Sequence, residues 1–136
     1  MSLLRREFSL RSLVELRHQI ELSAHDSGLS DLALYRFVVA VNEITTNAVR
    51  HGGGHGLLEL WRTTSRLHCR ISDHGPGLPG DHRAHRPSTH ATSGRGLWLA
   101  EQSCDDLTIE TGVRGTTVTL STSATSRRSA AGRAPG

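Results

Sequence analysis

The apolar residues of this chain change their period at Gly56, and this change most constrains what the chain can fold into. Before it, apolar side chains recur every three or four residues between Ala33 and Ala48. That spacing predicts a helix which begins after Ser30, a favourable N-cap, and continues without a breaker to Gly52. It is the longest helix that the sequence predicts.

After Gly56 the apolar side chains alternate with period two, as they do in strands that are buried on one face. Leu58 and Leu60 alternate with Leu57, Glu59 and Trp61, and Cys69 and Ile71 repeat the pattern after a turn at residues 65–66. The segment therefore predicts a β-hairpin. Its second strand ends at residue 73.

The residues before the long helix predict two smaller elements. Glu7–Leu10 suits a short edge strand. The run from Ser12 to Glu15 resembles a capping box, so a helix is predicted from there to about Ser27, with Gly28 as its stop.

Beyond the hairpin, residues 79–93 are polar, rich in histidine and without period, which is typical of a mobile loop. A short helix is predicted over 94–104, followed by strands at 107–111 and 116–120, where the sheet should end. Residues 122–136 are too polar to bury a face. We therefore expect one domain over residues 1–121 and a disordered tail over 122–136.

Length and composition exclude several classes of protein. The 136 residues suit one compact domain, and neither a leader nor an apolar stretch long enough to span a membrane is present, so a cytoplasmic protein is expected. Cys69 and Cys104 are expected to be packed or inert thiols. The net charge of +3 is modest and scattered, which argues against direct binding of nucleic acid.

All sixteen basic residues are arginine. The absence of lysine excludes the Walker site and the protein-kinase site, because both need a lysine on the phosphates. His82 and His85 have the spacing of metal ligands, yet the segment lacks cysteine and patterned carboxylates. A transition-metal site is therefore disfavoured.

Three short motifs follow one another along the chain in an order that suits a nucleotide site. The first places Glu43 and Asn47 four residues apart, on one face of the predicted long helix. The second is Asp73-x-Gly75-x-Gly77, at the end of a predicted strand. The third, Gly94-Arg95-Gly96-Leu97, opens a predicted helix.

This arrangement resembles the histidine-kinase-like ATPase superfamily with the Bergerat (GHKL) nucleotide fold, and within it the anti-sigma factor serine/threonine kinases of bacteria. The resemblance covers about residues 5–121 and includes Gly115-Thr116, which is similar to the strand that closes the adenine pocket. It implies an α+β two-layer sandwich, a mixed but largely antiparallel sheet of about four or five strands covered on one face by about three helices. It also implies ATP and Mg²⁺ as cofactors.

The chemistry of the motif residues agrees with these implied roles. The Asp73 carboxylate can accept a hydrogen bond from the exocyclic amine of adenine, whereas guanine presents a carbonyl there. Asn47 offers magnesium a neutral oxygen, and Glu43 can accept the proton of an attacking hydroxyl. Glycines and backbone amides can cradle phosphates. The nucleotide-binding set is then Asn47, Asp73, Gly75, Gly77, Gly94, Arg95, Gly96, Leu97 and Thr116, with Glu43 catalytic and Asn47 on Mg²⁺.

Each of these residues also has a plainer interpretation. Asp73 on this view only caps the turn that follows it, and Glu43 and Asn47 are solvated helix residues. Arg83 and Arg86, which are other candidates for neutralising a triphosphate, then belong to a solvated loop. The joint occurrence of the three motifs favours the nucleotide site.

The resemblance implies a protein kinase that phosphorylates a small antagonist protein, binds a sigma factor, and forms a homodimer. A sensor histidine kinase is disfavoured because only about forty residues precede Glu43, too few for a helical phosphoacceptor domain. Two alternatives remain open. One is a non-catalytic binding module that responds to ATP, and the other is an ATPase piece of a larger assembly.

Overall fold

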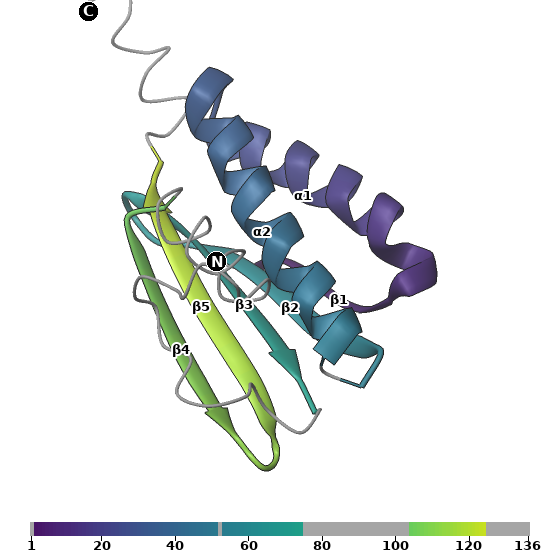
Figure 1. Ribbon diagram of the computed structural model, residues 1–136. Coiled ribbons are helices and arrows are strands. Elements are labelled where there is room, and N and C mark those ends of the chain that lie inside the picture. The colour runs from purple at the N-terminus through teal and green to yellow at the C-terminus, as the bar shows by residue number, and fades with distance from the viewer. Residues whose placement is uncertain (1, 52, 75–103, 125–136) are drawn as a thin grey trace, which may run out of the picture.

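The computed structural model describes residues 2–51, 53–74 and 104–124, which form a five-stranded sheet with two α-helices on one of its faces (Figure 1). The strand order is β1-β2-β3-β5-β4, and all four neighbouring pairs are antiparallel. The predicted α+β sandwich is confirmed. The third predicted helix lies almost wholly outside the described residues. The elements are β1 (Ser2–Ser9), the 3-10 helix η1 (Leu10–Ser12), α1 (Leu13–Asp26), α2 (Asp31–His51), β2 (His55–Arg62), β3 (Arg66–Asp73), β4 (Asp106–Gly112) and β5 (Gly115–Ser123).

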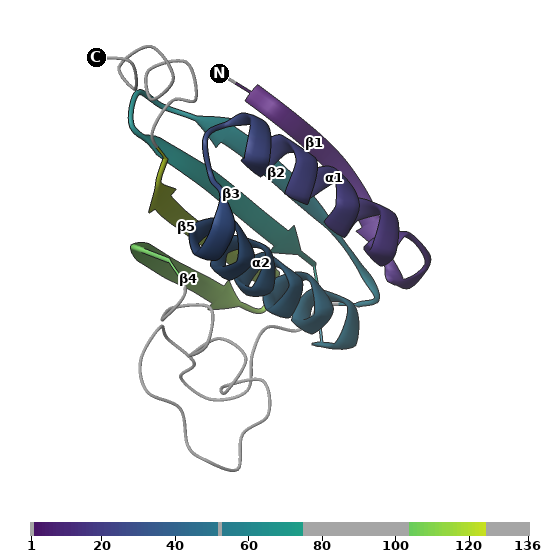
Figure 2. The same ribbon diagram turned by 90° about the horizontal axis from the view of Figure 1, so that it is seen from above.

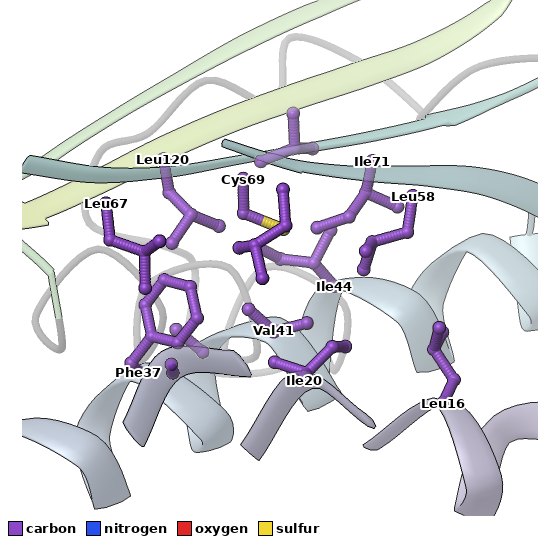
Figure 3. Close-up of a cluster of buried hydrophobic side chains, with 14 of the residues drawn as sticks. Leu16, Ile20, Phe37, Val41, Ile44, Leu58, Leu67, Cys69, Ile71 and Leu120 are labelled. Carbon is purple, nitrogen blue, oxygen red and sulfur yellow. The ribbon is translucent and has the colours of Figure 1, made fainter. Parts of the chain in front are cut away.

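The hydrophobic core lies between the helices and the sheet. Viewed from above, α1 lies on the β1 side of the sheet, whereas α2 crosses β2, β3 and β5 (Figure 2). Side chains of both helices point toward those of β2, β3 and β5 (Figure 3). Phe37 and Leu58 are completely buried there, as the predicted helical stripe and strand alternation require. The labelled core residues are Leu16, Ile20, Phe37, Val41, Ile44, Leu58, Leu67, Cys69, Ile71 and Leu120.

The long helix and the hairpin lie where the sequence predicts them. α2 spans Asp31–His51, which agrees with the prediction that it begins after Ser30 and ends at Gly52. β2 and β3 pair from Gly56 with Asp73 to Arg62 with Leu67. α1 ends at Asp26, and the next glycine, Gly28, has a φ of 112°, a conformation that glycine adopts readily.

The start of the chain differs from the prediction. β1 covers Ser2–Ser9 rather than residues 7–10, because it pairs with β2 along its length and this ladder satisfies backbone groups of a polar segment. Ser12 does precede α1, but its hydroxyl does not cap that helix. It donates instead to the Ser9 carbonyl oxygen at 3.3 Å and accepts the Ser9 amide at 2.9 Å, so the predicted capping box was wrong.

The end of the sheet also lies later than predicted. β5 continues to Ser123, and Ala124 is buried in the core. The Asp105 carboxylate holds this extension, because its Oδ2 accepts both the amide and the hydroxyl of Ser123, at 2.7 and 2.8 Å. These two hydrogen bonds hold the pKa of Asp105 below its usual value. Residues 125–136 of the predicted tail lie outside the described residues.

Neither of the described α-helices is apolar enough over eighteen residues to cross a membrane. α2 is long enough, but its polar face carries charged side chains. The described residues therefore show no helical membrane span.

Candidate nucleotide site

Asp73 is the last residue of β3, and it lies on the face of the sheet that the helices cover, like the buried Ile71 two residues before it. Its Oδ1 accepts the backbone amide of Thr116 in the neighbouring strand β5, at 3.2 Å. The Thr116 side chain is buried, and its Oγ1 lies 2.8 Å from Oγ1 of Thr111 in β4. Hydrogen bonds thus link the ends of three adjacent strands.

The geometry of Gly115 brings β5 against the end of β3. Its φ is 136°, and a Cβ placed there would overlap the carbonyl oxygen of Asp73 and lie 2.9 Å from Cα of His74. A side chain at residue 115 is incompatible with the observed approach of the β5 backbone to the β3 backbone. The amide of Thr116, the next residue, reaches Asp73 only because Gly115 lacks a side chain.

On the other side of Asp73, β2 also presents a glycine. Gly56 is the register partner of Asp73, and a Cβ on Gly56 would lie 2.7 Å from both Phe8 Cζ and the Ser72 carbonyl oxygen. Sequence reasoning missed this second glycine contact and the role of Thr111. A signal for Thr111 was present, because two threonines flank the predicted turn at residues 112–115 and must face each other in a tight hairpin.

α2 carries Glu43 and Asn47 one helical turn apart, near its C-terminal end. Both side chains are half-buried, whereas Ile44 and Ala48, the neighbours that follow them, are buried against the core. Figure 1 shows that the C-terminal end of α2, the end of β3 and the beginning of β5 lie at the same end of the domain. The fold therefore brings the first motif, Asp73 and Thr116 to one end of the layer between helix and sheet.

Nδ2 of Asn47 is buried and has no hydrogen-bond partner among the described residues. A buried amide donor without an acceptor costs roughly 1–3 kcal/mol, so an acceptor from outside the described chain is favourable there. A phosphate oxygen is such an acceptor, and the amide oxygen of the same side chain is the hard ligand that magnesium prefers. The donor set thus fits a Mg²⁺–phosphate group.

Within residues 2–51, 53–74 and 104–124 there is no cluster of three or more histidine, cysteine, aspartate or glutamate side chains that suits a metal ion. A magnesium ion that is held by one side chain together with phosphates and water needs no such cluster. The remaining candidates lie outside the described residues: Gly75, Gly77, His82, Arg83, His85, Arg86, Gly94, Arg95, Gly96 and Leu97. Their predicted roles stay predictions.

A protein-family model described as a histidine kinase-like ATPase domain matches residues 7–122 of the chain. The chain therefore belongs to the histidine kinase-like ATPase family. The match begins within β1 and ends one residue before the end of β5, so it includes both α-helices and the strands β2, β3 and β4 in full. A search of curated protein sequences found no match.

Solved structures show the same fold. The mycobacterial sensor histidine kinase MprB is 16% identical, with a TM-score of 0.57 over 89% of this chain and 98% of that one. The catalytic domain of the histidine kinase ThkA is 14% identical, with a TM-score of 0.58 over 92% and 100%. Full-length ShkA in complex with AMPPNP is 20% identical, with a TM-score of 0.59 over 92% of this chain and 32% of its own length.

Proposed function

We propose that this protein is an ATP-dependent serine/threonine protein kinase of the anti-sigma factor type. It transfers the γ-phosphate of ATP to a hydroxyl of a small antagonist protein, and it binds a sigma factor. The single observation that carries the nucleotide-binding part is the placement of a half-buried Asn47 with an unsatisfied amide at the same end of the fold as Asp73. ShkA, of the same fold, has been solved with AMPPNP, which supports ATP as the nucleotide.

In the proposed mechanism, the Asp73 carboxylate would accept a hydrogen bond from the exocyclic amine of adenine. Thr116, whose backbone amide donates to Asp73, would close the pocket beside it. Asn47 would offer an oxygen to Mg²⁺ and an amide hydrogen to a phosphate oxygen. Bound Mg²⁺ would neutralise the charge that develops on the transferred phosphoryl group. Gly75, Gly77, Gly94, Arg95, Gly96 and Leu97 complete the proposed nucleotide site.

Glu43 is the proposed base. It lies one helical turn from Asn47, so its carboxylate is near the phosphates that Asn47 would contact. Serine and threonine hydroxyls are poor nucleophiles and gain from a base that accepts their proton. The half-buried carboxylate on α2 therefore favours a hydroxyl acceptor over an activity that needs no base.

Calorimetry tests the nucleotide site. Asp73→Asn should lower the affinity for Mg-ATP by about ten- to a hundredfold, because it replaces a charge-assisted hydrogen bond to adenine. The amide oxygen of the new side chain can still accept from Thr116, so the fold is retained. Asp26→Asn changes a side chain that is 80% exposed at the end of α1, and this matched control should leave the affinity unchanged. An unchanged affinity for Asp73→Asn would contradict the adenine assignment.

A pull-down tests the kinase activity. The 136-residue chain is used as bait in a lysate of the source cell, with and without Mg-ATP, and phosphorylated residues are mapped in the proteins that it recovers. A sigma factor and a small protein phosphorylated on serine or threonine are expected. Phosphate found on histidine would contradict the serine/threonine assignment. Glu43→Gln should bind Mg-ATP within about threefold of wild type and lose at least about a hundredfold in transfer. Glu110→Gln, an exposed change in β4, is the matched control.

The second candidate is a non-catalytic module in which ATP controls a partner. If Glu43→Gln binds ATP and transfers phosphate at the wild-type rate, the proposed base is wrong. If the wild-type protein binds ATP and a partner but never transfers phosphate, the module is the better description. Binding and transfer are therefore measured on the same preparations.

A further inference from the structure

Two threonine hydroxyls meet at the end of the β4–β5 hairpin, next to the candidate contact for adenine. Thr111 and Thr116 are register partners in this ladder, and their Oγ1 atoms lie 2.8 Å apart. That separation is typical of a well-formed hydrogen bond between two hydroxyls. Thr116 is buried and Thr111 is exposed, so the bond connects the interior of the candidate site to its rim.

This threonine pair faces the layer between the helices and the sheet. Side chains alternate between the two faces of a strand, and Thr116 has the same parity as the buried Val118 and Leu120. Thr111 lies on the same face, because it is the register partner of Thr116. The backbone amide of Thr116 donates to Asp73 Oδ1 at 3.2 Å. The Thr116 hydroxyl is therefore within one side-chain length of the carboxylate that is proposed to receive adenine.

The direction of the bond between the two hydroxyls decides what Thr116 can offer a ligand. A threonine hydroxyl has one proton to donate and two lone pairs that accept. If Thr111 donates to Thr116, the proton of Thr116 is left for an acceptor on the ligand. If Thr116 donates to Thr111 instead, its oxygen can only accept. Thr111 thus controls the hydrogen-bonding character of its buried neighbour.

Adenine needs an acceptor and a donor side by side. Its exocyclic amine donates a hydrogen bond, and the ring nitrogen N1 beside that amine accepts one. Asp73 is the proposed acceptor for the amine. A Thr116 hydroxyl that accepts from Thr111 would be the donor for N1. A proton whose direction is fixed before the ligand arrives also spares the cost of ordering it on binding.

We propose that Thr111 is a positioning residue for the nucleotide: its hydroxyl donates to Thr116 and thereby directs the Thr116 proton toward N1 of bound adenine. This inference rests on the proposed function, because it requires ATP in the site. Thr111 lies outside the sequence motifs and acts on the nucleotide only through Thr116.

Calorimetry of the whole chain tests this role with Mg-ATP and with Mg-1-deaza-ATP, an analogue in which a C–H group replaces N1. Wild type should bind Mg-ATP about three- to tenfold more tightly, the contribution of one hydrogen bond. Thr111→Val keeps the shape of the side chain but lacks the hydroxyl. It should bind Mg-ATP about two- to fivefold more weakly than wild type, and its preference over the analogue should fall to at most about twofold. Structural damage alone would weaken both nucleotides equally and leave the preference unchanged.

Two further variants serve as controls, and thermal unfolding checks that each variant is folded. Thr108→Val is the matched control, because Thr108 and Thr119 are a second pair of threonines in register in the same two strands. The exposed Thr108 lies on the opposite face of the sheet, since it is an odd number of residues from Thr111. Thr108→Val should therefore leave the preference unchanged. Thr111→Ser retains the hydroxyl and should keep the wild-type preference.

The outcomes separate this role from the proposed function. If wild type binds Mg-ATP but shows no preference over the analogue, the role of Thr111 is overturned and the nucleotide site stands. The same holds if Thr111→Val keeps the full preference, if Thr108→Val loses as much of it, or if Thr111→Ser does not retain it. A wild-type chain that binds neither nucleotide would overturn the proposed nucleotide site, and the role of Thr111 with it.

Discussion

Gly115 shows how one missing side chain shapes the candidate site. Its φ is positive, and a Cβ at this position would overlap the Asp73 carbonyl oxygen, so the observed backbone leaves no room for alanine. Gly115→Ala should therefore lower the free energy of unfolding by about 2 kcal/mol or more, through backbone strain and displacement of β5. Urea unfolding measures this loss.

Gly112, the other glycine of the same hairpin, is the control for that change. A Cβ at Gly112 meets nothing within 4 Å. Gly112→Ala should alter stability by less than about 0.5 kcal/mol, as surface changes usually do. Equal losses for the two variants would show that the approach to Asp73 is not what makes Gly115 necessary.

At the scale of elements, Arg62 connects the end of α1 to the end of β5. Its Nη1 donates to the Ser27 carbonyl oxygen at 2.8 Å and its Nη2 to the Ala124 carbonyl oxygen at 3.0 Å. Arg62→Met keeps the apolar stem but removes both hydrogen bonds. It should cost about 1–3 kcal/mol of stability, measured by chemical unfolding.

Arg5 provides the comparison. Its side chain is 68% exposed and its Nε lies 3.5 Å from Glu59 Oε2, an ordinary surface ion pair. Arg5→Met should cost less than about 0.5 kcal/mol. If both arginine variants lost the same stability, the two carbonyl contacts of Arg62 would not be what stabilises these ends.

The spacing of apolar residues predicted α2, β2 and β3 well, because each of these elements buries one face and leaves the other more exposed. The stripe of α2 and the alternation of Leu58 and Leu60 are consequences of one-sided burial, and periodicity detects burial directly. β1 and the last residues of β5 were underestimated, since their polar residues give no such signal. Pairing with β2 holds β1, and hydrogen bonds from Ser123 to Asp105 hold the end of β5.

At the scale of the whole molecule, Cys69 reports on global unfolding. It is completely buried at the centre of the core, and burial raises the pKa of its thiol well above the usual value, so the reactive thiolate is suppressed. In a Cys104→Ser variant, a thiol reagent should modify the protein only as fast as the whole domain opens. The rate should then follow the urea dependence of unfolding.

Wild type supplies the contrast, because the half-buried Cys104 should react first under native conditions. Its thiol donates to the Asp106 carbonyl oxygen at 3.3 Å, near the start of β4 rather than in the core. Fast modification of Cys69 in the folded variant would contradict the inert role that the sequence and the structure assign to it.

The sequence alone determined the order and type of the main elements, the absence of a lysine-based phosphate site, and the motif residues Glu43, Asn47 and Asp73. These follow from periodicity and residue chemistry, which are local properties. Only the tertiary structure decided that Thr116 donates to Asp73, that Gly115 makes this approach possible, and that the amide of Asn47 is buried with no partner among the described residues. Those facts depend on which strands become neighbours, and strand pairing joins residues that are far apart in the sequence.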